Sequence, residues 1–288
     1  MNQQPFLKRI KQHFPEITFK RSRILTNGWD NVAIILDNKI IFRFPRKRQN
    51  PQFKIELALN PFLIKRISSV PIPHYTFIPK DKSFVGYTMI QGKSITPERF
   101  KKIPLSQKQK IAKQLVNFLH ELHRFPVPTA RKCGVISAWS AIDARKWHEE
   151  QAIIAYKKMS KQDSAIVKDL IRLYDKNYNF KPQLAHQDLT WDNMLISKNK
   201  TVTGVIDFGD IQITDPAGDI GRLAEYGIDF MDLMIKYYRP KEKNFRNRAI
   251  KAYVFFSLSL LAFSVTMKRK DYWQRGYEMI KTRKAGSI

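Results

Sequence analysis

The sequence predicts a two-lobed α+β protein, with an antiparallel sheet and one helix in the first lobe and mostly helices in the second. Short apolar runs separated by turn residues fill the first part of the chain, which is typical of a sheet. Later apolar residues mostly recur every three or four positions, as in helices packed on a core. Two short apolar runs in this later part, Met194–Ile196 and Val202–Ile206, are expected to be neighbouring strands. We assign the lobes to residues 1–90 and 91–288.

The first lobe is expected to begin with a short amphipathic helix, because Phe6, Leu7, Ile10 and Phe14 share one side of residues 5–14. A three-stranded meander, a helix and a further pair of strands follow. The expected strands are 17–25, 32–36, 40–44, 72–78 and 84–90, and the helix contains 53–59. The first turn of the meander, residues 26–31, holds a single glycine, Gly28.

The second lobe is expected to contain seven helices, at 106–124, 140–159, 164–178, 216–226, 229–238, 245–267 and 271–284. The longest apolar run, Tyr253–Val265, has 13 residues, which favours a buried helix over a membrane span. His120 and His123 lie three positions apart, but no acid or cysteine motif accompanies them. We therefore interpret both histidines as packing residues and not as metal ligands.

The composition excludes several classes of protein. An apolar content of 43% and an aromatic content of 12% indicate a globular protein and not a disordered one. The single cysteine, Cys133, excludes an internal disulfide framework. No apolar signal segment follows the first residues, so we expect a cytoplasmic protein.

The net charge of +27 is unevenly distributed along the chain. Residues 1–110 carry 22 basic and 6 acidic side chains, whereas residues 186–235 carry 3 basic and 9 acidic ones. Such an acidic region suits metal ions and a cationic small molecule. No interleaving of aromatic and basic residues predicts a nucleic-acid site, although a basic surface that binds RNA or acidic lipid remains an alternative.

A catalytic motif lies within this acidic region. His186, Asp188 and Asn193, followed by Asp207-Phe208-Gly209, reproduce the order and spacing of a kinase catalytic loop and metal-binding loop. In that chemistry one Asp accepts the proton of a hydroxyl, while Asn and a second Asp hold the metal that bridges the nucleotide phosphates. We predict Asp188 as the catalytic residue, and Asn193 and Asp207 as ligands of Mg²⁺.

Two segments around this motif resemble the aminoglycoside phosphotransferase family, and most nearly the aminoglycoside 2''-phosphotransferases. They are H-Q-D-L-T-W-D-N-M-L-I and V-I-D-F-G-D-I-Q-I-T-D-P-A-G-D-I, whose D-P-A-x-D tail protein kinases lack. The likeness covers about residues 17 to 265. It implies a protein-kinase-like fold that binds ATP or GTP between its lobes and phosphorylates a hydroxyl of a small, cationic acceptor such as an aminoglycoside.

The likeness also implies a nucleotide site. Arg43 stands where a kinase has a phosphate-binding lysine, and Glu56 is its expected partner. The backbone of Thr88, Met89 and Ile90 would bind the purine. Tyr87 would stand behind the base, which in this family goes with guanine use, and Leu195 and Ile206 would form the floor of the pocket.

Acceptor contacts are expected from acids near the catalytic loop and on a neighbouring helix. The candidates are Asp192, Asp210, Glu149 and Glu150, with the aromatic residues Tyr272, Trp273 and Tyr277 as flanking or packing groups. Asp215 and Asp219 are interpreted as structural, the first as a helix cap and the second as a brace for the catalytic loop.

Three alternatives stay open. The acceptor could be another small alcohol, such as a macrolide, choline, homoserine or a sugar, because one fold serves many substrates. A further alternative is a pseudokinase, which binds a nucleotide but does not transfer its phosphate. It is compatible with Arg43 and with the single Gly28 in the turn where a kinase places its glycine-rich, phosphate-covering loop. The third alternative is the basic surface protein described above.

Overall fold

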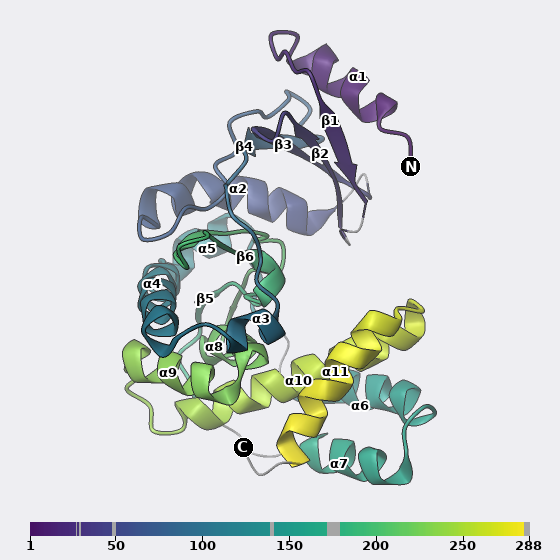
Figure 1. Ribbon diagram of the computed structural model, residues 1–288, viewed down its shortest axis with the longest axis vertical. Helices are drawn as coiled ribbons and strands as arrows, with labels where there is room; N and C mark the ends of the chain where they lie inside the picture. The colour runs from purple at the N-terminus through teal and green to yellow at the C-terminus, as the bar shows by residue number, and fades with distance from the viewer. Residues whose placement is uncertain (27, 29, 48–49, 139–140, 172–178, 285–288) are drawn as a thin grey trace.

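The computed structural model describes the chain except residues 27, 29, 48–49, 139–140, 172–178 and 285–288. The two predicted lobes are present: the sheet lobe lies at one end of the long axis and the helical lobe fills the rest (Figure 1). Helix α2 (Pro51–Arg66) lies between the sheet and the second lobe. The predicted α+β class is confirmed.

The first lobe is built on a four-stranded antiparallel sheet in the order β1 (Ser22–Leu25), β2 (Asn31–Leu36), β3 (Ile40–Pro45) and β4 (Val85–Thr88). The β2–β3 turn uses Asp37 and Asn38 at φ of 48° and 53°, a conformation that these residue types tolerate. Helix α1 (Gln4–His13) inserts the fully buried Ile10 into a cluster rich in phenylalanine that contains Phe42, Phe44 and Phe84.

Two expectations for this lobe are wrong. The strand predicted at 72–78 does not form, and only Phe77 pairs with Gly86 as an isolated bridge. The prolines at 71 and 73 cannot donate to a sheet, and the Asn60 side chain binds the Pro73 carbonyl and the Tyr75 N–H instead. The predicted first strand, 17–25, is also shorter, because pairing with β2 begins at Ser22.

Helix α2 is longer than the predicted segment 53–59. The Asn50 side chain accepts a hydrogen bond from the Phe53 N–H at 3.2 Å and caps the helix, which then runs to Arg66. The helix contains Pro61 and buries Phe53, Glu56, Leu59, Asn60 and Leu63. This buried face is what brings Glu56 beneath the sheet.

The second lobe contains the predicted helices with adjusted ends. They are α4 (Leu105–His123), α6 (Ala141–Tyr156), α7 (Lys161–Ile171), α8 (Ala217–Arg222), α9 (Ile228–Tyr238), α10 (Phe245–Thr266) and α11 (Lys270–Lys284). A 3₁₀ turn, Leu223–Tyr226, continues α8. Residue 140 of one predicted helix and residues 172–178 of another lie outside the described residues. The short helices α3 (Pro97–Lys101) and α5 (Val127–Lys132) were not predicted.

Two small antiparallel pairs carry the motif residues. The expected pair forms from β6 (Met194–Ile196) and β7 (Val202–Val205). A second pair, β5 (Gln183–Ala185) and β8 (Gln212–Thr214), was not predicted, because three-residue strands leave too short a pattern to recognise.

Helix α10 is the central element of the second lobe. It is long and apolar enough to span a membrane by composition, but 61% of the apolar window is buried inside the protein. Helices α6, α8 and α11 pack against it (Figure 1). This packing is that of a core helix, as the sequence predicts.

Candidate active site

The fully buried Asp219 holds the catalytic loop between β5 and β6 in place. Its carboxylate accepts hydrogen bonds from the His186 N–H at 2.9 Å and the Gln187 N–H at 2.8 Å, and contacts His123 Nε2 at 2.9 Å. These bonds hold Gln187 at a φ of 64°, a conformation rare for residues other than glycine. Asp219 is therefore the internal brace that the sequence predicts. His123, expected to be a packing residue, is buried and also holds the Asp219 carboxylate in place.

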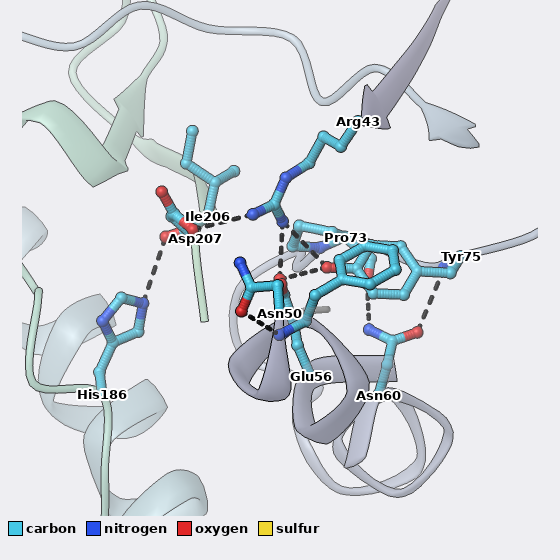
Figure 2. Close-up of polar contacts among 10 residues, drawn as sticks. Arg43, Asn50, Glu56, Asn60, Pro73, Tyr75, His186, Ile206 and Asp207 are labelled. Carbon is cyan, nitrogen blue, oxygen red and sulfur yellow. Dashed lines mark hydrogen bonds and ion pairs between the residues drawn. The ribbon is translucent and has the colours of Figure 1, made fainter. Parts of the chain in front are cut away.

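His186 connects this loop to the segment that carries Asp207. Its Nε2 donates to the Ile206 carbonyl at 3.2 Å, while Nδ1 accepts from the Asp188 N–H at 3.3 Å. Burial lowers the pKa of His186, which favours the neutral ring, and these two hydrogen bonds require its proton to be on Nε2. Figure 2 shows the imidazole reaching across to the backbone just before Asp207.

Asp188 and Asn193 lie in direct contact. Asn193 Nδ2 donates to the Asp188 backbone carbonyl at 2.9 Å and to Asp188 Oδ2 at 2.7 Å. Both amide protons are thus used on Asp188, which turns the amide oxygen of Asn193 away from it. The pKa of Asp188 is raised to about 7. Burial is the main cause; the charges of Asp210 and Asp207 act in the same direction, and the charge of Arg222 opposes them.

Asp207 follows β7 and adopts a φ of 65°, so the side chain turns sharply out of the strand direction. Its side chain is 51% exposed, and Oδ1 lies 3.0 Å from Arg43 Nη2. A carboxylate has two oxygens, so Oδ2 can bind a cation while Oδ1 holds the arginine. The structure therefore brings Asp207 to the junction of the two lobes (Figure 2).

Arg43, Glu56, Tyr75 and Asp207 form a network that we call the Arg43 cluster. Arg43 Nη1 lies 2.6 Å from Glu56 Oε1 and donates to the Tyr75 hydroxyl at 3.0 Å. Tyr75 in turn donates to Glu56. The side chains of Arg43 and Glu56 are only 8% and 4% exposed, so this is no surface ion pair.

The segment after β4 runs alongside the β6–β7 pair, where Lys93 and Ile196 exchange backbone hydrogen bonds of 3.1 and 2.9 Å. The Met89 N–H donates to the Lys39 carbonyl at 2.7 Å, and the Met89 carbonyl accepts from Gln91. These partners occupy Met89, so Thr88 and Ile90 are the better candidates for binding a base through the backbone.

Tyr87 is buried beside Tyr75, with ring centres 5.7 Å apart. Leu195 and Ile206 are half-buried on the β6–β7 side.

A second network, the Arg275 cluster, consists of Arg275 on α11, Glu225 and Asp192. Arg275 Nε and Nη2 bind the Glu225 carboxylate at 2.5 and 2.7 Å, and Nη1 binds Asp192 Oδ2 at 2.9 Å. Asp192 thus already has a cationic partner. The exposed Asp210 lies three residues after Asp207 and also faces the charge of Arg222.

The other predicted acceptor residues lie on α6 and α11, outside the catalytic loop. Glu150 helps line an open hollow of about 410 Å³, whose lining residues Asp143, Lys146, Trp147 and Glu150 all belong to α6. Glu149, also on α6, is half-buried. Trp273 and Tyr277 stack on each other, and Tyr277 donates to Asp163 of α7 at 2.7 Å. Asp215 accepts from the Ala217 N–H and binds Arg248, which supports its structural assignment.

Oxygen ligands at the lobe junction fit Mg²⁺. The amide oxygen of Asn193 and the carboxylate of Asp207 are hard donors of the kind this ion prefers. Within the described residues, no group of three or more His, Cys, Asp or Glu side chains could hold a metal ion. A site completed by phosphate oxygens and water needs only one or two protein ligands.

Sequence reasoning missed Tyr75, Arg222, Glu225 and Arg275. No motif contains them, and Arg275 is 83 positions from Asp192 along the chain. Tertiary contacts alone bring these residues to the site, Tyr75 through Arg43 and Glu56, and Arg275 through the docking of α11 beside the catalytic loop.

Comparisons with known proteins identify the family and the fold. The model of the phosphotransferase enzyme family (APH) matches residues 22–256. A structure of APH(2")-IIIa with GDP and kanamycin is 26% identical, with a TM-score of 0.86 and 99% of each chain covered. A GDP complex of wild-type aminoglycoside 2'-phosphotransferase-IIIa is 27% identical, with a TM-score of 0.84 and 100% of each chain covered. Macrolide 2'-phosphotransferase type I shares the fold at 17% identity, with a TM-score of 0.71 and 96% of each chain covered.

Proposed function

The chain belongs to the phosphotransferase enzyme family, and from this premise we propose that it transfers the γ-phosphate of a nucleotide to a hydroxyl of an aminoglycoside. The observation that supports the proposal is that Asn193 binds Asp188, while Asp207 acts on the Asp188 carboxylate by its charge and pairs with Arg43. Two relatives above 25% identity were solved in complex with GDP, one of them also with kanamycin.

Asp188 orients the acceptor hydroxyl and takes its proton. Asn193 supports this role by holding Oδ2 of Asp188 in place and by keeping its own amide oxygen free for a cation. Asn193 and Asp207 would hold Mg²⁺, which neutralises the phosphate charge during transfer. Arg43, fixed by Glu56 and Tyr75, directs its guanidinium toward the phosphate oxygens.

The nucleotide is proposed to lie between lobes divided near residue 90, with its base against Tyr87, Thr88 and Ile90 and above Leu195 and Ile206. The buried Tyr87 narrows the back of this pocket, and the GDP complexes of the relatives favour GTP as the donor, with ATP as the alternative. We place the enzyme in the cytoplasm, where nucleotides and magnesium are abundant.

The test is a phosphorylation assay with kanamycin as acceptor and either GTP or ATP as donor, with and without Mg²⁺. We expect kanamycin to gain the mass of one phosphate only when nucleotide and Mg²⁺ are both present. Asp207→Ala should abolish the product, because it removes both a metal ligand and the partner of Arg43. Full activity of Asp207→Ala, or activity in the presence of EDTA, contradicts the assignment.

A panel of macrolide, choline, homoserine and sugar acceptors accompanies this assay. The fold alone does not choose among these acceptors, as the macrolide phosphotransferase of the same fold illustrates. Turnover of one of them without turnover of kanamycin would keep the catalytic assignment and replace the acceptor. Nucleotide binding without any turnover would favour the pseudokinase alternative.

A further inference from the structure

The Arg275 cluster extends from the interior of the second lobe to its surface. Glu225 is 3% exposed, Arg275 19% and Asp192 47%. One guanidinium therefore neutralises a buried carboxylate and an open one at the same time. Trp191 and Phe256 face the same guanidinium, each with its ring centre 5.4 Å away.

The cluster borders the place where an acceptor must bind. Asp192 lies four residues after Asp188 in the same loop, and the charge of Arg275 acts on the Asp188 carboxylate. An acceptor whose hydroxyl reaches Asp188 therefore brings its other substituents close to Asp192. Ammonium groups on such an acceptor would normally pair with carboxylates of this kind.

Close helix packing fixes the position of Arg275. A Cβ atom at the neighbouring Gly276 would lie 2.8 Å from the Ser257 carbonyl oxygen of α10, so only glycine allows α11 to approach this closely. Arg222 on α8 approaches α10 in the same way, since a Cβ at Gly221 would lie 2.3 Å from the Ala249 carbonyl oxygen. Two arginines on two helices are thus held against one face of the site.

Arg222 adds a second positive charge that the acids only partly satisfy. Its guanidinium lies 3.8 Å from the centre of the Phe256 ring, and its buried Nη1 atom has no hydrogen-bond partner. Its positive charge also acts on Asp188, Asp210 and Glu225, so these acids offer a cation less net negative charge than their number in the sequence indicates.

Resting on the proposed aminoglycoside acceptor, we propose that Arg275 is a specificity-determining residue. Its guanidinium occupies the half-exposed carboxylate of Asp192, which an acceptor ammonium group would otherwise bind, while the buried Glu225 holds the guanidinium in place. An incoming ammonium does not readily replace it, because leaving Glu225 unpaired in the interior is costly. The wild-type site consequently gains little affinity from an additional amino group on the acceptor near this position.

The experiment compares kanamycin with an N-acetylated kanamycin that has lost one positive charge. Calorimetry in the presence of GDP gives the dissociation constant of each, without any need for turnover. The dissociation constant of the N-acetylated kanamycin divided by that of kanamycin measures how strongly the site recognises the charge. Because both ligands are titrated into the same preparation, a reduced folded fraction affects both titrations alike and leaves this ratio unaffected.

We expect Arg275→Gln to increase this ratio about tenfold, because Asp192 becomes free to bind an ammonium group. The double variant Arg275→Gln/Asp192→Asn should return the ratio toward the wild-type value. Arg275→Lys keeps a positive charge but cannot bind both carboxylates through a planar fork, so it should give a smaller increase. Arg275→Lys retains a cation for Glu225 and tests the proposal if Arg275→Gln does not fold.

Arg246→Gln is the matched control. Arg246 binds Asp232 through the same two-pronged geometry, at 2.7 and 3.1 Å, but far along α10 from the catalytic loop. Its removal should leave the ratio unchanged. An unchanged or lower ratio in both Arg275 variants overturns the proposal, as does an equal increase in Arg246→Gln. Failure of the wild type to phosphorylate kanamycin counts against the proposed function only, since the binding ratio is measured independently.

Discussion

The Arg43 cluster and the Arg275 cluster are built alike but lie in different parts of the fold, one on β3 and the other on α11. Each holds one arginine between a buried glutamate and a half-exposed aspartate: Glu56 and Glu225 are 4% and 3% exposed, and Asp207 and Asp192 are 51% and 47% exposed. The buried glutamate keeps its arginine in place, because separating the pair would leave an uncompensated charge in the interior. We therefore expect the first cluster to hold one geometry for phosphate, and the second to set the charge that the acceptor meets.

The largest effect is expected at Asp188, on which the charges of Asp207 and Arg275, one from each cluster, both act. Asp188→Asn removes the proton acceptor and should lower kcat about 10²- to 10⁴-fold with both donor nucleotides. In the wild type, kcat should rise with pH and level off above about pH 7, since the carboxylate must be ionised. A pH-independent rate between pH 5.5 and 8.5 would count against Asp188 as the base.

The same substitution should stabilise the folded protein. Asp188 ionises near pH 3.8 in the unfolded chain but near pH 7 when folded, so its charge costs stability above about pH 7 and costs nothing below pH 3.8. Asp188→Asn should raise the free energy of unfolding by about 2 kcal/mol at pH 8, with the gain vanishing near pH 4. Urea titrations at both pH values measure this difference.

The next largest effect separates the two clusters directly. Glu56→Gln leaves the buried Arg43 without its main counter-charge and should cost about 3–5 kcal/mol of stability. It should also raise the KM for nucleotide. Glu225→Gln is its counterpart in the Arg275 cluster and should change the KM for the acceptor more than that for nucleotide. A reversed pattern would show that we have assigned the clusters to the wrong substrates.

A smaller effect is expected where α11 docks on α10. Gly276→Ala places a Cβ atom 2.8 Å from the Ser257 carbonyl oxygen, so α11 must shift, at about 1–3 kcal/mol. The shift should move Arg275 and alter the KM for the acceptor, while the KM for nucleotide stays near the wild-type value. Equal changes in both constants would indicate a general loss of folding and no specific link to Arg275.

The smallest effect is expected for Tyr75→Phe, which removes one hydroxyl from the Arg43 cluster. The lost hydrogen bonds to Arg43 and Glu56 should cost about 1–3 kcal/mol of stability and should raise the KM for nucleotide severalfold. If Tyr75 matters only because position 43 is arginine, the effect should shrink in an Arg43→Lys background. A double-mutant cycle measures this coupling, and strict additivity would show that the hydroxyl acts independently of Arg43.

Local patterns in the sequence were sufficient for the catalytic loop. Asp188, Asn193 and Asp207 lie within 20 positions, beside two short strands whose apolar pattern predicts their pairing. The same holds for Glu56, which lies on a helix that directly follows the strand of Arg43. The strand expected at 72–78 does not form. Asn60, 13 residues before Pro73, binds the Pro73 carbonyl and the Tyr75 N–H, which are backbone groups that a sheet would need.

The sequence by itself indicated which groups we propose for the chemistry, since spacing along a loop between short strands fixes how close they can come. Tertiary structure alone decided how much charge surrounds them: Arg275 reaches Asp192 only because Gly276 lets two helices touch far from the motif. The acidic segment 186–235 was therefore a poor guide to the charge of the site. Charges act through space, and the cations that neutralise an acid can come from any part of the chain.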